Sequence, residues 1–277
     1  MQFYIYYNNK RKVIKAILAF LFLFLFILKL KGQGKKYKIV AISYANQKYK
    51  TQLEINKKTA LEIGKVTEYY AFGPEDIDKS FQNKNKDILS RKRGNGYWLW
   101  KPYFILKTLK EKLKEGDYLI YSDAGILYIN STYNIINFLK KKNIDIWAYQ
   151  LQYKEKIWTK RDAFLLLGVD HPNFTESYQY MAGIQIYRKS NLSQGFLEDV
   201  LHYSTDKRII TDEKNSLGFP NYKGFKQNRH DQTVLSLMIK KYGFKLTNIK
   251  TPFTFCIYRR LKFKDYNDLK NKCKKIK

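Results

Sequence analysis

The sequence predicts an α/β fold built on one mostly parallel sheet with helices on its faces. Short apolar runs typical of buried strands alternate along the chain with longer segments of helical periodicity, which is the order of elements in parallel α/β sheets. The chain has 277 residues, of which 44% are hydrophobic, and this is enough for one large core. The sequence contains no evident internal repeat or second domain, so we expect a single folded domain.

The first elements are a strand, a helix and a second strand. Residues 37–43 are predicted as a strand, and an amphipathic helix over residues 51–70 is expected to end in a short strand near Val66. The Gly-Pro pair at residues 73–74 breaks this unit, because both residues favour turns. Residues 76–93 are polar and are predicted to be partly helical.

The remaining elements continue the alternation of strands and helices. Residues 103–114 carry apolar side chains on one side at helical spacing, and Gly116 ends that helix. Strands are predicted at residues 117–121, 144–149 and 182–187, and helices at residues 130–142, 159–167, 192–202 and 231–242.

An uninterrupted apolar run at residues 16–28 lies between basic residues near the N-terminus. As a helix this run would span roughly 20 Å, which is short of a hydrocarbon core of roughly 30 Å. Residues 13–30 would come close to spanning it if Lys15 and Lys29 extend their charged ends to the interface. A cleaved signal peptide also fits the run, but no small-residue cleavage site follows Leu28.

We therefore predict two parts of the chain. Residues 1–34 form an N-terminal membrane anchor or signal-like segment with a linker, and residues 35–277 form the folded domain with a basic C-terminal tail. The protein is expected to be membrane-associated through residues 13–30. Basic residues flank the run on both sides, so the sequence assigns no side of the membrane.

The chain is strongly basic, with a formal net charge of +29 at pH 7. The positive charge is mostly Lys spread along the whole chain, while Arg, which recognises bases and phosphates better, is scarce. This favours a solvated surface over a nucleic-acid site, and we expect no nucleic-acid partner. Anionic lipid or an anionic glycan acceptor stays open. The alternative is a non-catalytic, membrane-associated polyanion- or nucleic-acid-binding protein, which would gather its basic residues on one face.

The two cysteines, Cys256 and Cys273, show no metal-site spacing and build no disulfide framework. Cys256 lies in an apolar, strand-like run and Cys273 in the Lys-rich tail. We expect one buried thiol and one exposed thiol.

Asp123 is the first candidate functional residue. It follows directly on an apolar strand, at the place where ligands bind in α/β sheets. Gly125 would let a ligand approach the backbone closely. The structural alternative is an aspartate that only caps the turn after the strand.

Residues 229–232, Arg-His-Asp-Gln, are the second candidate. They precede an apolar helix and combine groups that bind metals, move protons and form hydrogen bonds. The structural alternative is that Asp231 serves only as the N-cap of that helix. If the strands at residues 117–121 and 182–187 are neighbours in a parallel sheet, we expect Asp231 to reach the crevice that contains Asp123.

Two of the four tryptophans lie in the third candidate, at residues 97–101. They either pack in the core or form a stacking wall beside a cation for a diphosphate. The basic residues just upstream, including Arg93, and the glycines around Gly96 could serve the same phosphates.

Together with polar clusters at residues 158–164 and 179–183, these blocks resemble a group of bacterial glycosyltransferase-like proteins with the GT-A fold. The matching segments are residues 94–102, 117–125, 158–164, 179–183 and 229–232. The resemblance implies a single GT-A-like, nucleotide-binding domain that transfers a sugar from a nucleotide-sugar donor to a glycan or lipid-linked acceptor. Metal-dependent phosphodiesterases and nucleases are a weaker alternative, because they need several paired carboxylates.

The resemblance also implies roles for single residues. The catalytic residues would be Asp231, His230 and Asp162. Donor binding would involve Tyr44, Arg93, Gly96, Trp100, Lys101, Tyr121, Asp123 and Gly125. The acceptor or the transferred sugar would contact Lys160, Gln179, Gly183 and Gln232.

GT-A transferases hold a divalent cation on an Asp-x-Asp motif, and here only the second aspartate, Asp123, is present. The resemblance implies Mn²⁺ or Mg²⁺ bound by Asp123 and His230. Mg²⁺ often keeps several waters and uses only one or two carboxylates, so one aspartate is compatible with a site.

Overall fold

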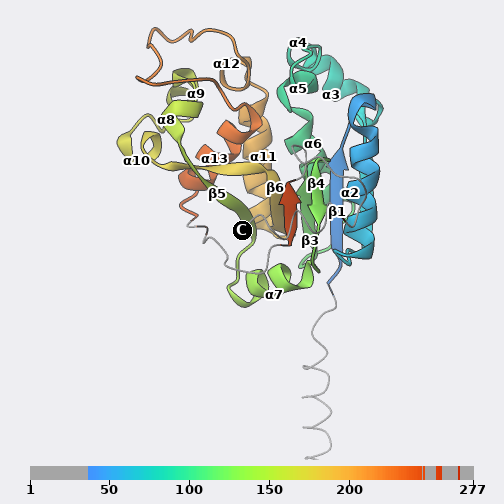
Figure 1. The fold of residues 1–277 in the computed structure, drawn as a ribbon. Coiled ribbons are helices and arrows are strands. Elements are labelled where there is room, and N and C mark those ends of the chain that lie inside the picture. The colour runs from blue at the N-terminus through green and yellow to red at the C-terminus, as the bar shows by residue number, and fades with distance from the viewer. Residues whose placement is uncertain (1–36, 245, 247–253, 258–267, 269–277) are drawn as a thin grey trace, which may run out of the picture. The chain divides into compact units, whose positions relative to one another are not determined.

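A computed structural model describes residues 37–244, 246, 254–257 and 268 (Figure 1). The chain divides into two units between Tyr37 and Lys38, and the second unit contains all the strands and helices named below. The predicted membrane segment, residues 13–30, lies outside the described residues. Within the described part of the chain, no helix has the length and apolar character needed to cross a membrane.

The core of the fold is a five-stranded sheet in the order β2-β1-β3-β6-β5. Strand β1 pairs in parallel with β2 and β3, whereas β6 is antiparallel to both β3 and β5. All strands except β6 therefore point the same way, which confirms the predicted mostly parallel mixed sheet. The strands are β1 Ile39–Tyr44, β2 Glu68–Phe72, β3 Tyr118–Ser122, β5 Ile146–Lys154 and β6 Tyr178–Arg188.

Helices cover both faces of the sheet (Figure 1). Helices α6, α11 and α13 pack against one another and against β3 and β6, while α2 packs on β1 and β2. The helices are α2 Lys50–Glu62, α3 Lys79–Lys84, α4 Lys86–Leu89, α5 Gly94–Tyr97, α6 Trp100–Glu111, α7 Tyr133–Lys141, α8 Glu155–Trp158, α9 Arg161–Leu166, α10 Pro172–Thr175, α11 Asn191–Ser204, α12 Lys207–Ile210 and α13 Asp231–Lys241, with 3-10 turns η1 Gln47–Tyr49 and η2 Pro74–Asp76.

The alternation of side chains along the strands explains these two layers. Val40 and Ile42 of β1 and Leu119 and Tyr121 of β3 belong to the main core cluster, together with side chains of α6, α11 and α13. The residues between them point to the opposite face, because successive side chains of a strand alternate. Ser122 therefore faces α2, where its hydroxyl accepts a hydrogen bond from Asn56.

The structure corrects two details of the predicted elements. The helix predicted over residues 51–70 ends at Glu62, and β2 begins only at Glu68. Lys65, between them, adopts φ of 57°, which no helix accommodates. A second, two-stranded sheet pairs β4 (Ile126–Tyr128) with β7 (Phe255–Ile257), the strand-like run that contains Cys256. Strand β4 and this pairing were not predicted, because three-residue strands carry almost no periodic pattern.

Cys256 lies in β7, which pairs with β4. It is disulfide-bonded, so the expectation of two thiols is wrong. Cys273 lies outside the described residues.

Candidate active site

A buried lysine joins two aspartates that are far apart in the sequence. The Nζ atom of Lys101, in the first turn of α6, lies 2.6 Å from Asp231 Oδ2 and 3.3 Å from Asp123 Oδ1. Its third neighbour is the carbonyl oxygen of Ala182 in β6, at 3.4 Å. Lys101 is 3% exposed, so the ammonium is engaged by the protein on every side. We call Asp123, Lys101 and Asp231 the carboxylate–lysine cluster.

Asp123 occupies its place because of the strands around it. It follows β3 directly, and its backbone N–H donates to the Gly183 carbonyl of β6 at 2.8 Å. The hydroxyl of Tyr121 donates to Asp123 Oδ1 at 2.7 Å. A Cβ at Gly183 would lie 3.1 Å from Asp123 Oδ2, so glycine there leaves room for the carboxylate. Gly125 lies in the turn that connects β3 to β4.

Asp231 reaches the same place from the other side of the cluster. It is the first residue of α13, and the N-cap position belongs to His230, which makes no side-chain cap hydrogen bond. The N-cap alternative for Asp231 is therefore wrong. The route is also different from the predicted one, because β6 is antiparallel to β3 and the two strands do not end at the same edge. The N-terminus of α13, and not the end of β6, brings Asp231 to Asp123.

Burial and the neighbouring charges act in opposite directions on the groups of the cluster. Burial acts to lower the pKa of Lys101, but the charges of Asp123 and Asp231 together outweigh it, so the pKa is raised and the ammonium stays charged. Burial raises the pKa of Asp231, and the nearby Lys101 charge offsets this only in part. Asp231 is thus a carboxylate with increased proton affinity, the property expected of a general base.

His230 adjoins the cluster but faces a different neighbour. Its Nδ1 lies 2.8 Å from the Ile210 carbonyl, which can only accept, so the proton is on Nδ1. Its Nε2 is buried without a hydrogen-bond partner and lies 3.7 Å from Asp212 Oδ1. The ring stacks on Trp98, with centroids 5.3 Å apart. Burial lowers the pKa of His230, and the imidazole is therefore neutral near physiological pH.

Asp212 is a site residue that the sequence did not indicate. One of its oxygens faces His230, and the other forms an ion pair of 3.1 Å with Arg93. Arg93 also contacts Gln227, so this predicted phosphate ligand links two loops. Asp212 lies in a polar loop without periodic pattern, and only the fold places it beside the histidine.

The tryptophan block mainly packs the core. Trp100 is buried and stacks on Tyr44, with ring centroids 3.7 Å apart, and its indole N–H donates to the Gly94 carbonyl at 2.9 Å. A Cβ at Gly96 would lie 2.7 Å from Leu89 Cα, and the residue has φ of 90°, so glycine is required there. Burial raises the pKa of Tyr44 to about 12. These contacts favour the packing interpretation of the block over a stacking wall for the donor.

The two glutamines predicted to bind acceptor belong to a buried hydrogen-bond chain. Glu155 accepts from Gln179 Nε2 at 2.9 Å, and Gln179 Oε1 accepts from Gln232 Nε2 at 2.8 Å. Gln232 Oε1 in turn accepts from the Ala182 N–H at 3.4 Å. Because a carboxylate only accepts, Glu155 fixes the orientation of both amides. These hydrogen bonds hold Gln232, the neighbour of Asp231, against β6.

Lys160 and Asp162 hold the loop that follows α12. The Nζ of Lys160 donates to the Glu213 carbonyl at 2.6 Å, and Asp162 Oδ2 accepts from the N–H and hydroxyl of Ser216 at 2.7 and 3.0 Å. Both side chains are buried. The structure therefore places them as anchors of the loop that carries Asp212, and no contact joins them to the carboxylate–lysine cluster in the described residues.

No protein-family model matches the chain, and no curated protein matches it in sequence. Solved glycosyltransferases are similar in structure. They include the bifunctional glycosyltransferase WbbM (TM-score 0.43, 7% identity, 74% of this chain and 38% of that chain covered). Mouse xyloside xylosyltransferase 1 has a TM-score of 0.42 and 11% identity, with 77% of this chain and 84% of that chain covered. The Mn/GDP form of core-mannan synthase A from Aspergillus fumigatus has a TM-score of 0.38 and 9% identity, with 75% of this chain and 70% of that chain covered.

This chain spans well under half the length of WbbM. All three TM-scores lie below 0.5.

Two cavities lie at different places in the described structure. One, of about 190 Å³, lies beyond the ends of β1 and β2 and is lined by residues 45–47, 50, 53–54 and 71–76. Its carboxylates are Glu54, Glu75 and Asp76, which accept hydrogen bonds and suit hydroxyl groups. Ligands of α/β sheets bind outside the carboxyl ends of strands, which favours this cavity as a ligand site.

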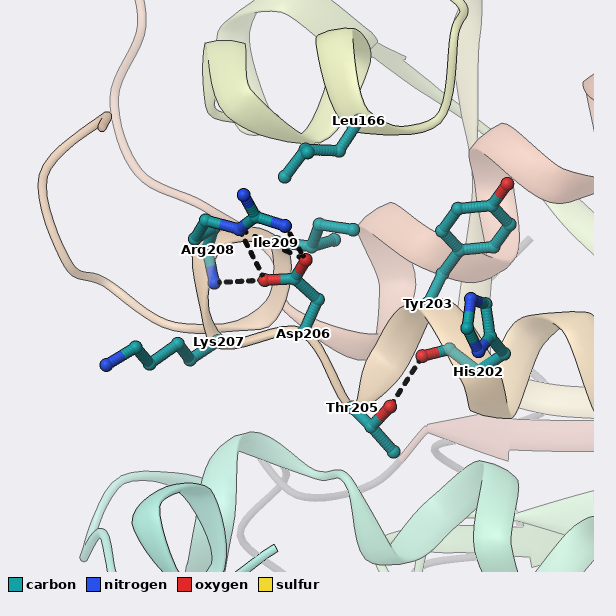
Figure 2. Close-up of a pocket in the computed structure, with 8 residues that line it drawn as sticks. All are labelled: Leu166, His202, Tyr203, Thr205, Asp206, Lys207, Arg208 and Ile209. Carbon is teal, nitrogen blue, oxygen red and sulfur yellow. Dashed lines mark hydrogen bonds and ion pairs between the residues drawn. The ribbon is translucent and has the colours of Figure 1, made fainter. Parts of the chain in front are cut away.

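The other cavity, of about 550 Å³, lies between the end of α11, α12 and α9 (Figure 2). Two of its charged residues neutralise each other, because the Arg208 guanidinium donates to both oxygens of Asp206. None of the predicted site residues lines it, and we assign it no role in the reaction. The lining residues are Leu166, His202, Tyr203, Thr205, Asp206, Lys207, Arg208 and Ile209.

Asp123 and His230 are the predicted metal ligands. Among the described residues, no group of three or more His, Cys, Asp or Glu side chains could hold a metal ion. Asp123 pairs with Lys101, while the two ring nitrogens of His230 face Ile210 and Asp212. A divalent cation held through Asp123 would therefore draw its other ligands from donor phosphates and water, as Mg²⁺ commonly does.

The buried ion pair between Glu155 and Lys240 leads to a prediction about stability. Lys240→Met removes the ammonium that contacts Glu155, leaving a fully buried carboxylate without its cation. We expect the free energy of unfolding to fall by about 3–5 kcal/mol, the usual cost of breaking a buried ion pair. Urea unfolding measures it. In the matched double variant Glu155→Gln with Lys240→Met the loss should be smaller, and equal losses in both variants would contradict the assignment.

Proposed function

We propose that this protein is a glycosyltransferase that moves a sugar from a nucleotide-sugar donor to a glycan or other surface acceptor. The observation that carries the proposal is the carboxylate–lysine cluster of Asp123, Lys101 and Asp231. It joins the end of a central strand to the N-terminus of α13. Asp231 is buried and Asp123 is partly buried, and taking charged groups out of water costs stability, so two carboxylates that share one buried lysine indicate a functional site.

The chemistry of sugar transfer matches these groups. The transferred sugar acquires positive charge as the nucleoside diphosphate leaves, and the negative charge of the cluster stabilises it. Asp231, whose pKa burial raises, is suited to accept the proton of the attacking hydroxyl. Lys101 keeps both carboxylates in place and is too deeply buried to meet the phosphates itself, which revises the role predicted for it.

The donor nucleoside would occupy the cavity beyond β1 and β2. Glu75 and Asp76 line it and offer acceptors for ribose hydroxyls. From β1 the chain first adds β2 on one side of it and then β3 on the other side, so the order of the strands reverses between β1 and β3. Asp123 follows β3, which is parallel to β1, and therefore lies at the same end of the sheet as this cavity. Such a switch point is the usual ligand site in open α/β sheets.

A bound Mg²⁺ or Mn²⁺ would be held by Asp123 with the donor phosphates, and would supply neutralisation of the departing diphosphate. We expect excess chelator to lower turnover at least about tenfold, because this neutralisation contributes several kcal/mol to the transition state. The measurement is release of nucleoside diphosphate with and without chelator, followed by re-addition of Mn²⁺. Unchanged turnover in chelator would contradict the proposed metal ion and would mean that side chains such as Arg93 neutralise the departing diphosphate.

The N-terminal segment supports a proposal for the location and the acceptor. We propose that residues 13–30 attach the protein to a membrane and that the acceptor is a glycan or lipid-linked sugar at that surface.

Nucleotide binding provides the test. Nucleoside diphosphates such as UDP and GDP, added to the full-length protein, should raise its melting temperature, since a ligand that binds only the folded state stabilises it. Stabilisation by DNA and polyphosphate, with none by any nucleoside diphosphate, would favour the alternative of a polyanion-binding protein.

A further inference from the structure

Aromatic side chains gather at the edge of the sheet beside the active site. Trp158 ends α8, and the Tyr153 ring lies 5.8 Å from it between centroids. Tyr153 is 49% exposed, which is unusual for a large aromatic residue that only packs a core. We call Tyr153 and Trp158 the aromatic platform.

Cations surround the platform. The guanidinium of Arg229 lies 4.1 Å from the Trp158 ring centroid, and the Lys226 ammonium lies 5.5 Å from it. Lys154 and Lys156 adjoin the platform and share one carboxylate, Glu176. The positive charges at this edge therefore outnumber the negative ones, and the surface attracts anionic ligands.

The platform is fixed to the turn that carries the reacting groups. The Trp158 carbonyl accepts hydrogen bonds from the Arg229 N–H at 3.0 Å and from the Thr233 hydroxyl at 3.3 Å. Arg229 and Thr233 flank His230 and Asp231 in the sequence. A ligand on the platform would therefore lie next to the N-terminus of α13, where Asp231 meets Lys101.

We propose that the aromatic platform is the binding site for the acceptor, and that the acceptor is a glycan bearing acidic groups. The apolar face of a sugar ring packs on aromatic rings, and Arg229 and Lys226 pair with its carboxylates or phosphates. This inference rests on the proposed glycosyltransferase function for its place in a reaction. The binding itself is measured without any donor.

The experiment titrates the full-length protein with oligosaccharides while intrinsic tryptophan fluorescence is followed. The probes are a galacturonate hexamer, a phosphomannan oligosaccharide and, as the neutral control, maltohexaose. A saturable change is expected with an acidic probe, and at least about tenfold weaker binding is expected with maltohexaose. A preference between the two acidic probes separates carboxylate from phosphate as the acid group. Equal affinity for all three probes would overturn the proposal.

Three variants locate the site. Trp158→Phe keeps an aromatic ring but should remove the fluorescence response while calorimetry still detects binding. Arg229→Gln should weaken acidic-probe binding about tenfold, because a charge-assisted contact is lost. Lys57→Gln is the matched control, since it removes one exposed charge on α2. An unchanged response in Trp158→Phe, or equal effects of Arg229→Gln and Lys57→Gln, would show that the ligand binds elsewhere or by net charge alone.

Failure of this inference and failure of the proposed function give different results. Acidic-probe binding on the platform without turnover of any nucleotide sugar would leave the platform standing and remove the transfer reaction. Turnover of a nucleotide sugar with no binding of either acidic probe would support the transfer reaction and overturn the assignment of the platform.

Discussion

Asp231→Asn is expected to lower kcat by a factor of about 100 or more, with the fold nearly unchanged. Asparagine has the same shape as aspartate and is tolerated at the start of a helix, so α13 should keep its N-terminus. The substitution removes the charge that lies 2.6 Å from Lys101 Nζ and the group best placed to accept a proton. Lys101 retains Asp123 as an ionic partner, which limits the loss of stability.

The measurement is steady-state kinetics with a donor that the wild-type protein turns over, together with urea unfolding of both proteins. The effect should appear in kcat, with KM for the donor changed much less, because the contact acts on the reacting centre. Asp87→Asn on the exposed face of α4 is the matched control and should leave kcat unchanged. A kcat of Asp231→Asn near the wild-type value would remove Asp231 from the reaction.

Lys101→Met should abolish measurable turnover and also destabilise the protein. Without the ammonium, the buried Asp231 and the partly buried Asp123 face each other uncompensated, and either one carboxylate takes a proton or the two move apart. We expect kcat to fall at least about 100-fold and the free energy of unfolding to fall by about 3–5 kcal/mol near neutral pH.

The pH dependence of that destabilisation has a definite sign. Burial and Asp123 raise the pKa of Asp231, and Lys101 is the group that lowers it, so the pKa rises further in the variant. A carboxyl whose pKa is higher in the folded state than in the unfolded state binds more protons when folded. The destabilisation should therefore be complete at pH values above the raised pKa and should shrink as the pH falls below it.

Urea unfolding at about pH 5 and about pH 8 measures this dependence. Lys107→Met, on the same helix, is the matched control because Lys107 pairs with Asp78 at the surface. A surface pair contributes about 1 kcal/mol or less, so the control should change stability little at either pH. A penalty for Lys101→Met that grows toward acidic pH would contradict the assigned charge states.

The sequence was sufficient for the elements that carry strong periodic patterns. The apolar runs at residues 117–121 and 182–187 became the central strands β3 and β6, and the helix predicted at residues 231–242 is α13. The direction of β6 could not be predicted, because the composition of a strand is the same in either direction. Strand direction depends on the connections and on the packing partners, which are properties of the whole fold.

The sequence identified residues that come together in the candidate site, but it did not predict the contacts between them. Asp123 and Asp231 were selected from their positions beside a strand and a helix, and the structure brings both to Lys101. Lys101 was expected to bind phosphate. Its ion pairs with Asp123 and Asp231 were missed, because these partners lie far away in the sequence and no local pattern reveals them. Asp212 was missed for the same reason, since only tertiary structure places its loop beside His230.

The most direct test is a screen of nucleotide sugars with the full-length protein, in which released nucleoside diphosphate is measured for the wild type and for Asp231→Asn. The proposed function predicts that the wild type consumes at least one donor, more rapidly when an acceptor glycan is present, and that the variant loses this activity by about 100-fold or more. A folded wild-type protein that releases no nucleoside diphosphate from any donor, or a variant that matches the wild type, would contradict it.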